Sequence, residues 1–129
     1  MAIDRENPRN AVKAVDNAAN LMKSNEASIG IYPEGTRNKT DQELLPFHHG
    51  AAMMSIKCKT PIIPIVIYSK PKFFRCTDIL IGEPFELTEY YNKKLSDEEM
   101  AQADEYLRQH MLEMRRKHTE YLANKKKAK

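Results

Sequence analysis

The chain has 129 residues, of which 41% are hydrophobic and 30% are charged, and its formal net charge is +3. This length allows one domain, and the composition is that of a globular chain rather than a disordered one. The longest apolar run, over residues 62–68, is interrupted by Pro64 and is too short to span a bilayer, which takes about 20 apolar residues.

The first predicted element is a helix over residues 8–24. Asn7 and Pro8 have the pattern of an N-cap followed by a proline in the first helical turn. The apolar residues that follow recur at helical spacing: Ala11, Val12, Val15, Ala18, Ala19 and Met22. After this helix, the short apolar run at residues 28–32 predicts a strand.

The middle of the chain predicts a loop, a short helix and a buried strand. Residues 38–46 are polar and predict the loop. A helix is expected over residues 50–59, with these side chains directed inward: Ala51, Ala52, Met54 and Cys58. Residues 62–68 are rich in β-branched side chains and predict a buried strand, whose prolines, Pro61 and Pro64, suit a strand start or edge.

Residues 69–77 are basic and aromatic, and the pattern leaves two interpretations open. The residues concerned are Lys70, Lys72, Phe73, Phe74 and Arg75. They form either a surface loop anchored by two rings or a loop that enters a membrane interface, where basic and aromatic side chains occur together. A third strand is predicted over residues 77–81, closed by the run Gly82-Glu83-Pro84.

The last predicted element is a long amphipathic helix over residues 96–123. Ser96 and Glu99 have the spacing of a capping box, and acidic residues fill the first turn. The residues predicted to face inward are spaced by threes, fours and their multiples: Met100, Ala103, Leu107, Met111, Met114 and Leu122. His110 and His118 lie on the same helix and are expected at the solvated surface.

The predicted order of elements, helix, strand, helix, strand, strand, helix, is an α/β pattern. A helical connection between the strands at 28–32 and 62–68 favours parallel pairing between them. We therefore expect a mixed sheet flanked by helices over residues 1–95. The helix and basic tail of residues 96–129 are expected to pack on the same domain.

The polar run Glu34-Gly35-Thr36-Arg37 follows Pro33 at the end of the first predicted strand. A strand that ends in this way places polar groups at the mouth of a site. Gly35 allows the backbone to bend or to approach a ligand closely. The guanidinium group of Arg37 has the planar fork that holds a phosphate or a carboxylate by two parallel hydrogen bonds.

Residues 32–38 resemble the third sequence block of the glycerolipid acyltransferases, above all the 1-acyl-glycerol-3-phosphate (lysophosphatidic acid) acyltransferases. That block reads Phe/Tyr-Pro-Glu-Gly-Thr-Arg-Ser, and Asn38 stands in place of its serine. Ile3-Asp4-Arg5 resembles the end of the family's second block, and residues 61–65 resemble the fourth. Residues 46–51 stand where the family has Phe-Lys-Lys-Gly or a similar run.

The resemblance covers residues 3–85 and lacks the family's first block, His-x-x-x-x-Asp. In the family, that histidine takes the proton from the acceptor hydroxyl group, and the aspartate orients the histidine. None of the four histidines in this chain is followed five residues later by an acidic residue. The chain therefore resembles the C-terminal part of an acyltransferase, and we expect it to carry no catalytic residue and to be inactive alone.

The resemblance implies an α/β fold and a reaction of phospholipid biosynthesis. An acyl group passes from acyl-CoA or acyl carrier protein to a lysophospholipid, 1-acyl-glycerol-3-phosphate. Arg37 is then expected to bind the acceptor phosphate, with Arg5 as the second candidate. Glu34 would orient Arg37 or bond the glycerol, while Gly35 and Thr36 would donate a backbone N–H and a hydroxyl group. The alternative for this cluster is a strand-end turn with an Arg–Glu ion pair.

Two histidines and two prolines complete the candidate site. His48 and His49 stand in place of family lysines and are expected near an anionic ligand; a second hypothesis makes them a replacement catalytic base. As cations they would hold an anion less well as the pH rises through about 6.5, where histidine loses its charge. Pro61 and Pro64 are expected to shape a strand beside the acyl channel.

The charge distribution bears on partners. From residue 111 onward, seven lysines and arginines stand against two glutamates, a net charge of +5, which leaves −2 for the first 110 residues. This basic end is either a solvated tail or a segment attracted to anionic lipid headgroups. It lacks the interleaved aromatic residues of a nucleic-acid-binding segment, so no nucleic-acid partner is expected.

Neither a metal nor a cofactor is expected beyond the acyl thioester co-substrate. Cys58 and Cys76 lack metal-ligand spacing and are too few for a disulfide framework. They predict reduced thiols in a cytoplasmic protein. Together with the basic tail, this favours a peripheral location at the cytoplasmic face of a membrane.

Three functions stay open. The first is an acyltransferase that is active only in a longer chain, and the second is a catalytically dead module that binds a lysophospholipid or an anionic membrane. The third is an interaction protein whose helix at 96–123 fits a partner's groove. For Arg37→Ala, the first two predict a loss of about 1.5–3 kcal/mol of binding energy from a charged hydrogen bond, and the third predicts none.

Overall fold

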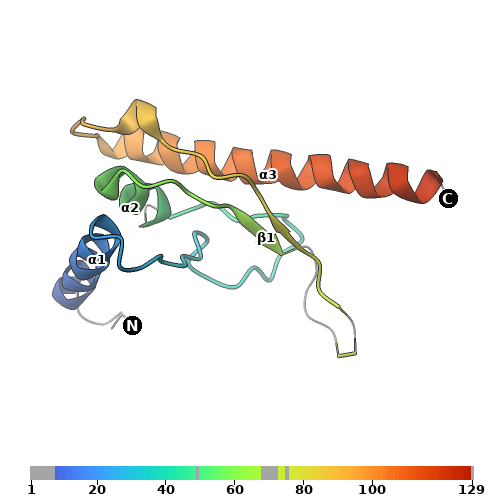
Figure 1. The fold of residues 1–129 in the computed structure, drawn as a ribbon, viewed down its shortest axis with the longest axis horizontal. Coiled ribbons are helices and arrows are strands. Elements are labelled where there is room, and N and C mark those ends of the chain that lie inside the picture. Colours follow the sequence, from blue (N-terminus) through green and yellow to red (C-terminus); the bar gives the residue numbers. More distant parts are fainter. Residues whose placement is uncertain (1–7, 49, 68–72, 75, 129) are drawn as a thin grey trace.

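The structure, a computed structural model, describes residues 8–48, 50–67, 73–74 and 76–128. The elements follow in this order: α1 (Pro8–Lys23), α2 (Gly50–Cys58), β1 (Ile65–Ile67), β2 (Ile79–Ile81), the 3₁₀ helix η1 (Thr88–Tyr90) and α3 (Asp97–Lys127). In Figure 1, α3 extends along the long axis of the molecule, with α1 and α2 toward one end of that axis. Three helices and a small sheet agree with the predicted mixture of helix and strand.

The three predicted helices are confirmed. α1 ends at Lys23 and α2 spans Gly50–Cys58, each within one residue of the prediction. The capping box before α3 is present: the Ser96 hydroxyl group accepts from Glu99 N, and the Glu99 carboxylate accepts from Ser96 N at 2.9 Å. Asn7, the predicted N-cap of α1, lies outside the described residues.

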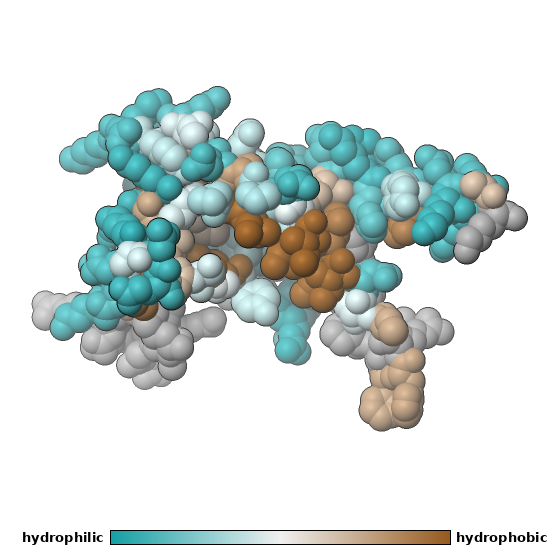
Figure 2. Space-filling view, viewed as in Figure 1, coloured by the Kyte–Doolittle hydropathy of each residue, from teal (hydrophilic) through white to brown (hydrophobic). Residues whose placement is uncertain are grey.

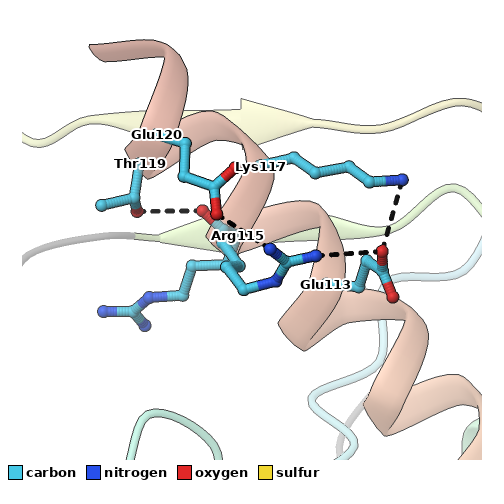
Figure 3. Close-up of polar contacts among 6 residues, drawn as sticks. Glu113, Arg115, Lys117, Thr119 and Glu120 are labelled. Atoms are coloured by element: carbon cyan, nitrogen blue, oxygen red, sulfur yellow. Dashed lines mark hydrogen bonds and ion pairs between the residues drawn. The ribbon is translucent and has the colours of Figure 1, made fainter. Parts of the chain in front are cut away.

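The helix α3 continues to Lys127, four residues beyond its predicted end. Its exposed face carries ion pairs one turn apart, which support a helix. Arg116 lies 3.2 Å from Glu113 and 2.8 Å from Glu120, and Lys117 lies 3.4 Å from Glu113 (Figure 3). The hydrogen bond from Lys117 and its charge, with the charge of Arg116, lower the pKa of the Glu113 carboxyl group.

Within the described residues, three clusters of buried side chains form the core. They comprise Ala18, Ala19, Met54 and Cys58 between α1 and α2; Ala52, Leu87 and Ala103 between α2, the chain before η1 and α3; and Leu44, Val66, Leu107 and Met111 between a loop, β1 and α3. The apolar positions of α1, α2 and the first half of α3 therefore face inward as predicted, where their side chains are described.

Three predictions for the face of α3 are wrong. Leu122 is 36% exposed, because the last turns of α3 extend beyond the core. His110 is half-buried, with its ring centroid 4.2 Å from that of Phe85. His118 is also half-buried rather than solvated, with its ring stacked on that of Tyr121.

The sheet differs from the prediction. β1 and β2 pair antiparallel, with Val66 opposite Leu80, and an isolated bridge joins Ile62 to Phe85. Residues 28–32 form no strand, so neither the parallel pairing nor the mixed sheet is present among the described residues. The physical reason is that a strand needs a neighbour for its backbone N–H and C=O groups, and no described segment offers one here.

The strand β1, which the sequence predicts to be buried, is covered on only one of its two faces. Val66 and Pro64 are buried, on the side of the core that contains α3. Because side chains alternate along a strand, the opposite face carries isoleucines. Each of them is at least half exposed: Ile63, Ile65, Ile67, Ile79 and Ile81. Hydrophobic side chains gather over the two strands in Figure 2. The described part of the chain supplies no second layer to cover them.

None of the helices within residues 8–48, 50–67 and 76–128 combines the length and the apolar character that a bilayer crossing requires.

Candidate functional site

Residues 32–35 form a tight turn that begins the candidate site. Gly35 N donates to Tyr32 O at 3.0 Å. Pro33 and Gly35 occupy the second and fourth positions of this turn, where type I turns favour these residue types. Gly35 has a φ of 64°, in the left-handed region that favours glycine. Its N–H group is thus engaged within the turn.

His48 returns to this turn at the end of the loop that follows it. His48 N donates to Pro33 O at 2.8 Å. The imidazole ring lies so close to Gly35 that a Cβ atom on that glycine would come within 2.7 Å of His48 Cδ2. The structure therefore brings His48 to the motif. His49 lies outside the described residues.

Glu34 is half-buried and anchors the loop from the side of the turn. Its Oε2 atom accepts a hydrogen bond from Leu45 N at 2.8 Å. No ion pair between Glu34 and Arg37 is present in this described segment, so neither the expected orientation of Arg37 by Glu34 nor the alternative Arg–Glu pair is found. The carboxylate instead connects the turn to the loop.

Thr36 and Arg37 are the exposed polar residues of the motif. Within the described ranges, no residue forms a hydrogen bond or an ion pair with the Arg37 guanidinium group. Its exposed N–H donors are thus not taken up by the described part of the chain and face solvent, from which an anion can approach. Arg5, the second candidate for this role, lies outside the described residues.

Asn38 organises the loop between the motif and His48. Its Oδ1 atom accepts from Thr40 N at 2.9 Å and from Thr40 Oγ1 at 2.8 Å, and its Nδ2 atom donates to Gln42 O at 2.8 Å. A serine has no amide to make this set of contacts. An asparagine side chain that hydrogen-bonds the backbone two residues ahead is a common feature of turns. The turn at Asn38 could therefore have been predicted from the sequence.

Arg108 on α3 belongs to the same framework, and the sequence pattern does not reveal it. Its Nε atom donates to Leu45 O at 3.1 Å, and its Nη2 atom donates to Leu44 O at 2.8 Å. Leu45 is therefore held by Glu34 at its N–H group and by Arg108 at its C=O group. Arg108 lies more than 60 residues along the chain from this loop, beyond the reach of any local pattern.

We expect Arg108→Ala to lower the free energy of unfolding by about 1–3 kcal/mol, because it leaves the partly buried carbonyl groups of Leu44 and Leu45 without their donor. Urea denaturation followed by circular dichroism measures the loss. The matched control is Arg116→Ala on the same helix, which removes only exposed ion pairs and should cost less than about 1 kcal/mol. Equal losses would show that the bonds from Arg108 to the loop contribute nothing.

The two predicted prolines have different environments. Pro61 is exposed, whereas Pro64 is fully buried and accepts a hydrogen bond from Gly82 N at 2.9 Å. An open groove of about 970 Å³ lies between the end of β2 and α3, lined by residues that include Ile81, Tyr106 and Leu112. Neither proline lines this groove. The role of Pro61 and Pro64 beside an acyl channel stays a prediction.

The described residues contain no group of three or more metal-ligating side chains. Cys58 is buried, with its Sγ atom 3.7 Å from Ala19 O, and Cys76 is exposed. Both thiols are free.

Comparisons with known proteins agree with the motif. The model of the Acyltransferase family matches residues 1–68, just over half of the 129-residue chain. The putative 1-acyl-sn-glycerol-3-phosphate acyltransferase acl-2 of Caenorhabditis elegans is 38% identical over an alignment of 80 residues, and this match covers 57% of this chain and 28% of that protein. The corresponding acl-1 protein of the same organism is 42% identical over 72 residues, 56% of this chain and 27% of its own length.

The human 1-acyl-sn-glycerol-3-phosphate acyltransferase alpha is 32% identical over 72 residues, which are 56% of this chain and 25% of the human protein. The chain thus spans about a quarter of the length of the curated relatives it matches. No solved structure matches it. The family match includes the turn, the loop, α2 and β1, whereas Arg108 on α3 lies outside it.

Proposed function

The chain belongs to the acyltransferase family, and we propose that it carries the acceptor-binding part of a 1-acylglycerol-3-phosphate O-acyltransferase of phospholipid biosynthesis. The relatives it matches are named 1-acyl-sn-glycerol-3-phosphate acyltransferases. The acceptor is then a lysophospholipid, and the donor is an acyl thioester, either acyl-CoA or acyl carrier protein. The product is phosphatidic acid.

One observation carries this proposal: the exposed guanidinium group of Arg37, which no described residue binds, directly follows a turn that hydrogen bonds hold in place. Pro33 is bound by His48, and Glu34 is bound by Leu45, so the backbone that leads to Arg37 is held in place. A preorganised site loses less conformational freedom when it binds a ligand. The Arg37 fork matches the oxygens of a phosphomonoester, which carries close to two negative charges at pH 7.

The other motif residues support the same role. The Thr36 hydroxyl group is exposed beside Arg37 and can donate to the phosphate or the glycerol. The His48 ring contacts the turn and adds a positive charge when it is protonated. Glu34 positions the turn by accepting a hydrogen bond from Leu45 N.

Acyl transfer also needs a base, because the acceptor hydroxyl group must lose its proton as it attacks the thioester carbonyl carbon. General-base assistance of this kind is worth about 10²–10⁴-fold in rate. The 129 residues contain no His-x-x-x-x-Asp sequence. We propose that this base comes from outside them, and that the chain alone binds the acceptor without turning it over.

We further propose that the protein works at the cytoplasmic face of an anionic membrane. The end of α3 is basic and exposed over Lys125, Lys126 and Lys127. Each basic residue near an anionic surface contributes on the order of 1 kcal/mol of attraction. The lysophospholipid acceptor lies in the membrane, so an enzyme bound at the membrane surface can reach it from the aqueous side.

We expect Arg37→Ala to weaken the binding of a short-chain lysophosphatidate by about 1.5–3 kcal/mol, roughly 10- to 150-fold in Kd, because a charged hydrogen-bond donor is lost. Isothermal titration below the critical micelle concentration of the lipid measures this change. Lys39→Ala is the matched control, since it removes an exposed cation of the same loop and should change Kd less than about threefold. A Kd that Arg37→Ala leaves unchanged would contradict the proposal.

The second candidate is a binding module that catalyses nothing, favoured by the lack of the His-x-x-x-x-Asp sequence. The coding sequence upstream of the Met1 codon separates the two. An in-frame His-x-x-x-x-Asp there supports the enzyme. A stop codon close upstream with no such sequence supports the module.

A further inference from the structure

Phe73 and Phe74 lie in the connection between β1 and β2, and they are 90% and 94% exposed. These are the highest exposures among the large hydrophobic side chains of the described residues. The two rings meet edge to face with their centroids 4.3 Å apart. In Figure 1 the short yellow-green segment that contains them lies away from the helices.

Rings this exposed bury almost no apolar surface within the chain. Transfer of a phenylalanine side chain from water into an apolar environment is strongly favourable, so the pair has an unused driving force for association. Because the two rings contact each other, they present one small apolar tip rather than an extended flat surface. A small, exposed apolar tip can enter a soft, deformable partner without a matching groove.

The charge of the surrounding sequence identifies that partner. Residues 68–78 contain three basic residues, Lys70, Lys72 and Arg75, and one acidic residue, Asp78. Aromatic side chains flanked by cations are typical of protein segments at the interface of a bilayer, where rings enter the headgroup region and cations meet anionic lipids. An apolar protein groove would give no reason for this excess of positive charge.

We propose that Phe73 and Phe74 form an insertion tip that enters the interface of a bilayer containing anionic lipid. This role rests on the proposal that the protein works at a membrane surface, and it assigns the contact to a particular pair of side chains. In Figure 1 the tip and the basic end of α3 lie toward the same end of the long axis. The basic end of α3 then adds attraction, while the rings provide the insertion.

The first test is sedimentation of the 129-residue chain with vesicles of phosphatidylcholine and phosphatidylserine. The double substitution Phe73→Ser and Phe74→Ser should lower the partition coefficient on the order of 100-fold, because each inserted ring contributes about tenfold. Tyr106→Ser is the matched control: it removes a half-exposed ring of α3 and should leave partitioning unchanged. Equal partitioning of the wild type and the double variant would overturn the proposal, as would a wild-type chain that binds no vesicles.

The second test uses the lack of tryptophan in the sequence. Phe74→Trp introduces a single fluorophore at the tip, and its emission should shift to shorter wavelength when anionic vesicles are added. Tyr106→Trp places the same fluorophore on α3 and should show no shift. An emission spectrum of the Phe74→Trp chain that vesicles leave unchanged overturns insertion of this side chain. An equal shift with vesicles of phosphatidylcholine alone overturns the assignment to anionic lipid.

Failure of this proposal is distinguishable from failure of the proposed function. The double phenylalanine variant should bind monomeric short-chain lysophosphatidate with the wild-type Kd, since its substitutions lie outside the turn. Arg37→Ala should lose that binding and still sediment with vesicles. A double variant that keeps vesicle binding overturns the insertion tip, whereas an Arg37→Ala chain that keeps lysophosphatidate binding overturns only the acceptor site.

Discussion

Leu107→Ala should lower the free energy of unfolding by about 2–5 kcal/mol, the usual cost of removing a buried leucine side chain and leaving a cavity. Leu107 is 1% exposed and packs in the cluster that contains Leu44, Val66 and Met111. Leu44 precedes Leu45, whose N–H group is bound by Glu34. The cavity should therefore also loosen the loop under the candidate site. Urea denaturation followed by circular dichroism measures the change in stability.

Two further variants keep this prediction interpretable. Leu122→Ala makes the same substitution on the same helix at a position that is 36% exposed, and it should cost less than about 1 kcal/mol. Leu107→Met nearly conserves the side-chain volume and should cost less than about 1.5 kcal/mol, so it remains measurable if the alanine variant does not fold. Similar losses for Leu107→Ala and Leu122→Ala would contradict the packing of α3 against β1 and the loop.

Gly35→Ala is expected to damage the candidate site itself. A non-glycine residue in the left-handed region costs about 1–2 kcal/mol, and Gly35 has a φ of 64°. The added Cβ atom would also come within 2.7 Å of His48 Cδ2, so the ring must move. We expect a loss of about 2–4 kcal/mol in stability from the two effects together. Lysophosphatidate binding, measured by titration calorimetry, should weaken at least about tenfold.

The control for this substitution is Gly30→Ala, because no atom lies within 4 Å of the position that its Cβ atom would take and its φ is not positive. It should change stability by no more than about 1 kcal/mol in either direction. Adding His48→Ala to the Gly35→Ala chain removes the crowding and should restore part of the stability, which a double-mutant cycle measures. Identical behaviour of Gly30→Ala and Gly35→Ala would mean that the turn at residues 32–35 is not as described.

The helices could be predicted because their signals are local. The capping box of Ser96 and Glu99 begins α3, and the apolar spacing of α1 and α2 identifies their inward faces. These signals act within a few residues, so the surrounding structure seldom changes them. The prediction failed at Leu122, because the helical pattern continues where the neighbouring core has ended.

The strands predicted at 62–68 and 77–81 are present as β1 and β2, but their pairing could not be predicted, because strand pairing is not local. The apolar runs at 28–32 and 62–68 look alike in sequence, yet only the second contains a strand, β1. A strand forms where a neighbour accepts its backbone hydrogen bonds, and for β1 that neighbour is β2. The exposure of the isoleucines has the same cause. A strand whose composition suits burial still needs another segment of the chain to cover its second face.

The sequence by itself determined the family motif, the three helices and the chemistry of Arg37, because residue types and short spacings fix these properties. Only the tertiary structure decided how the motif is held. It directs Glu34 to Leu45, places the ring of His48 on Gly35, and brings Arg108 from α3 to the same loop. These contacts join residues that the chain separates by 11 to 63 positions. Their existence depends on how the helices and the loop pack, and packing is a property of the whole fold rather than of any one segment.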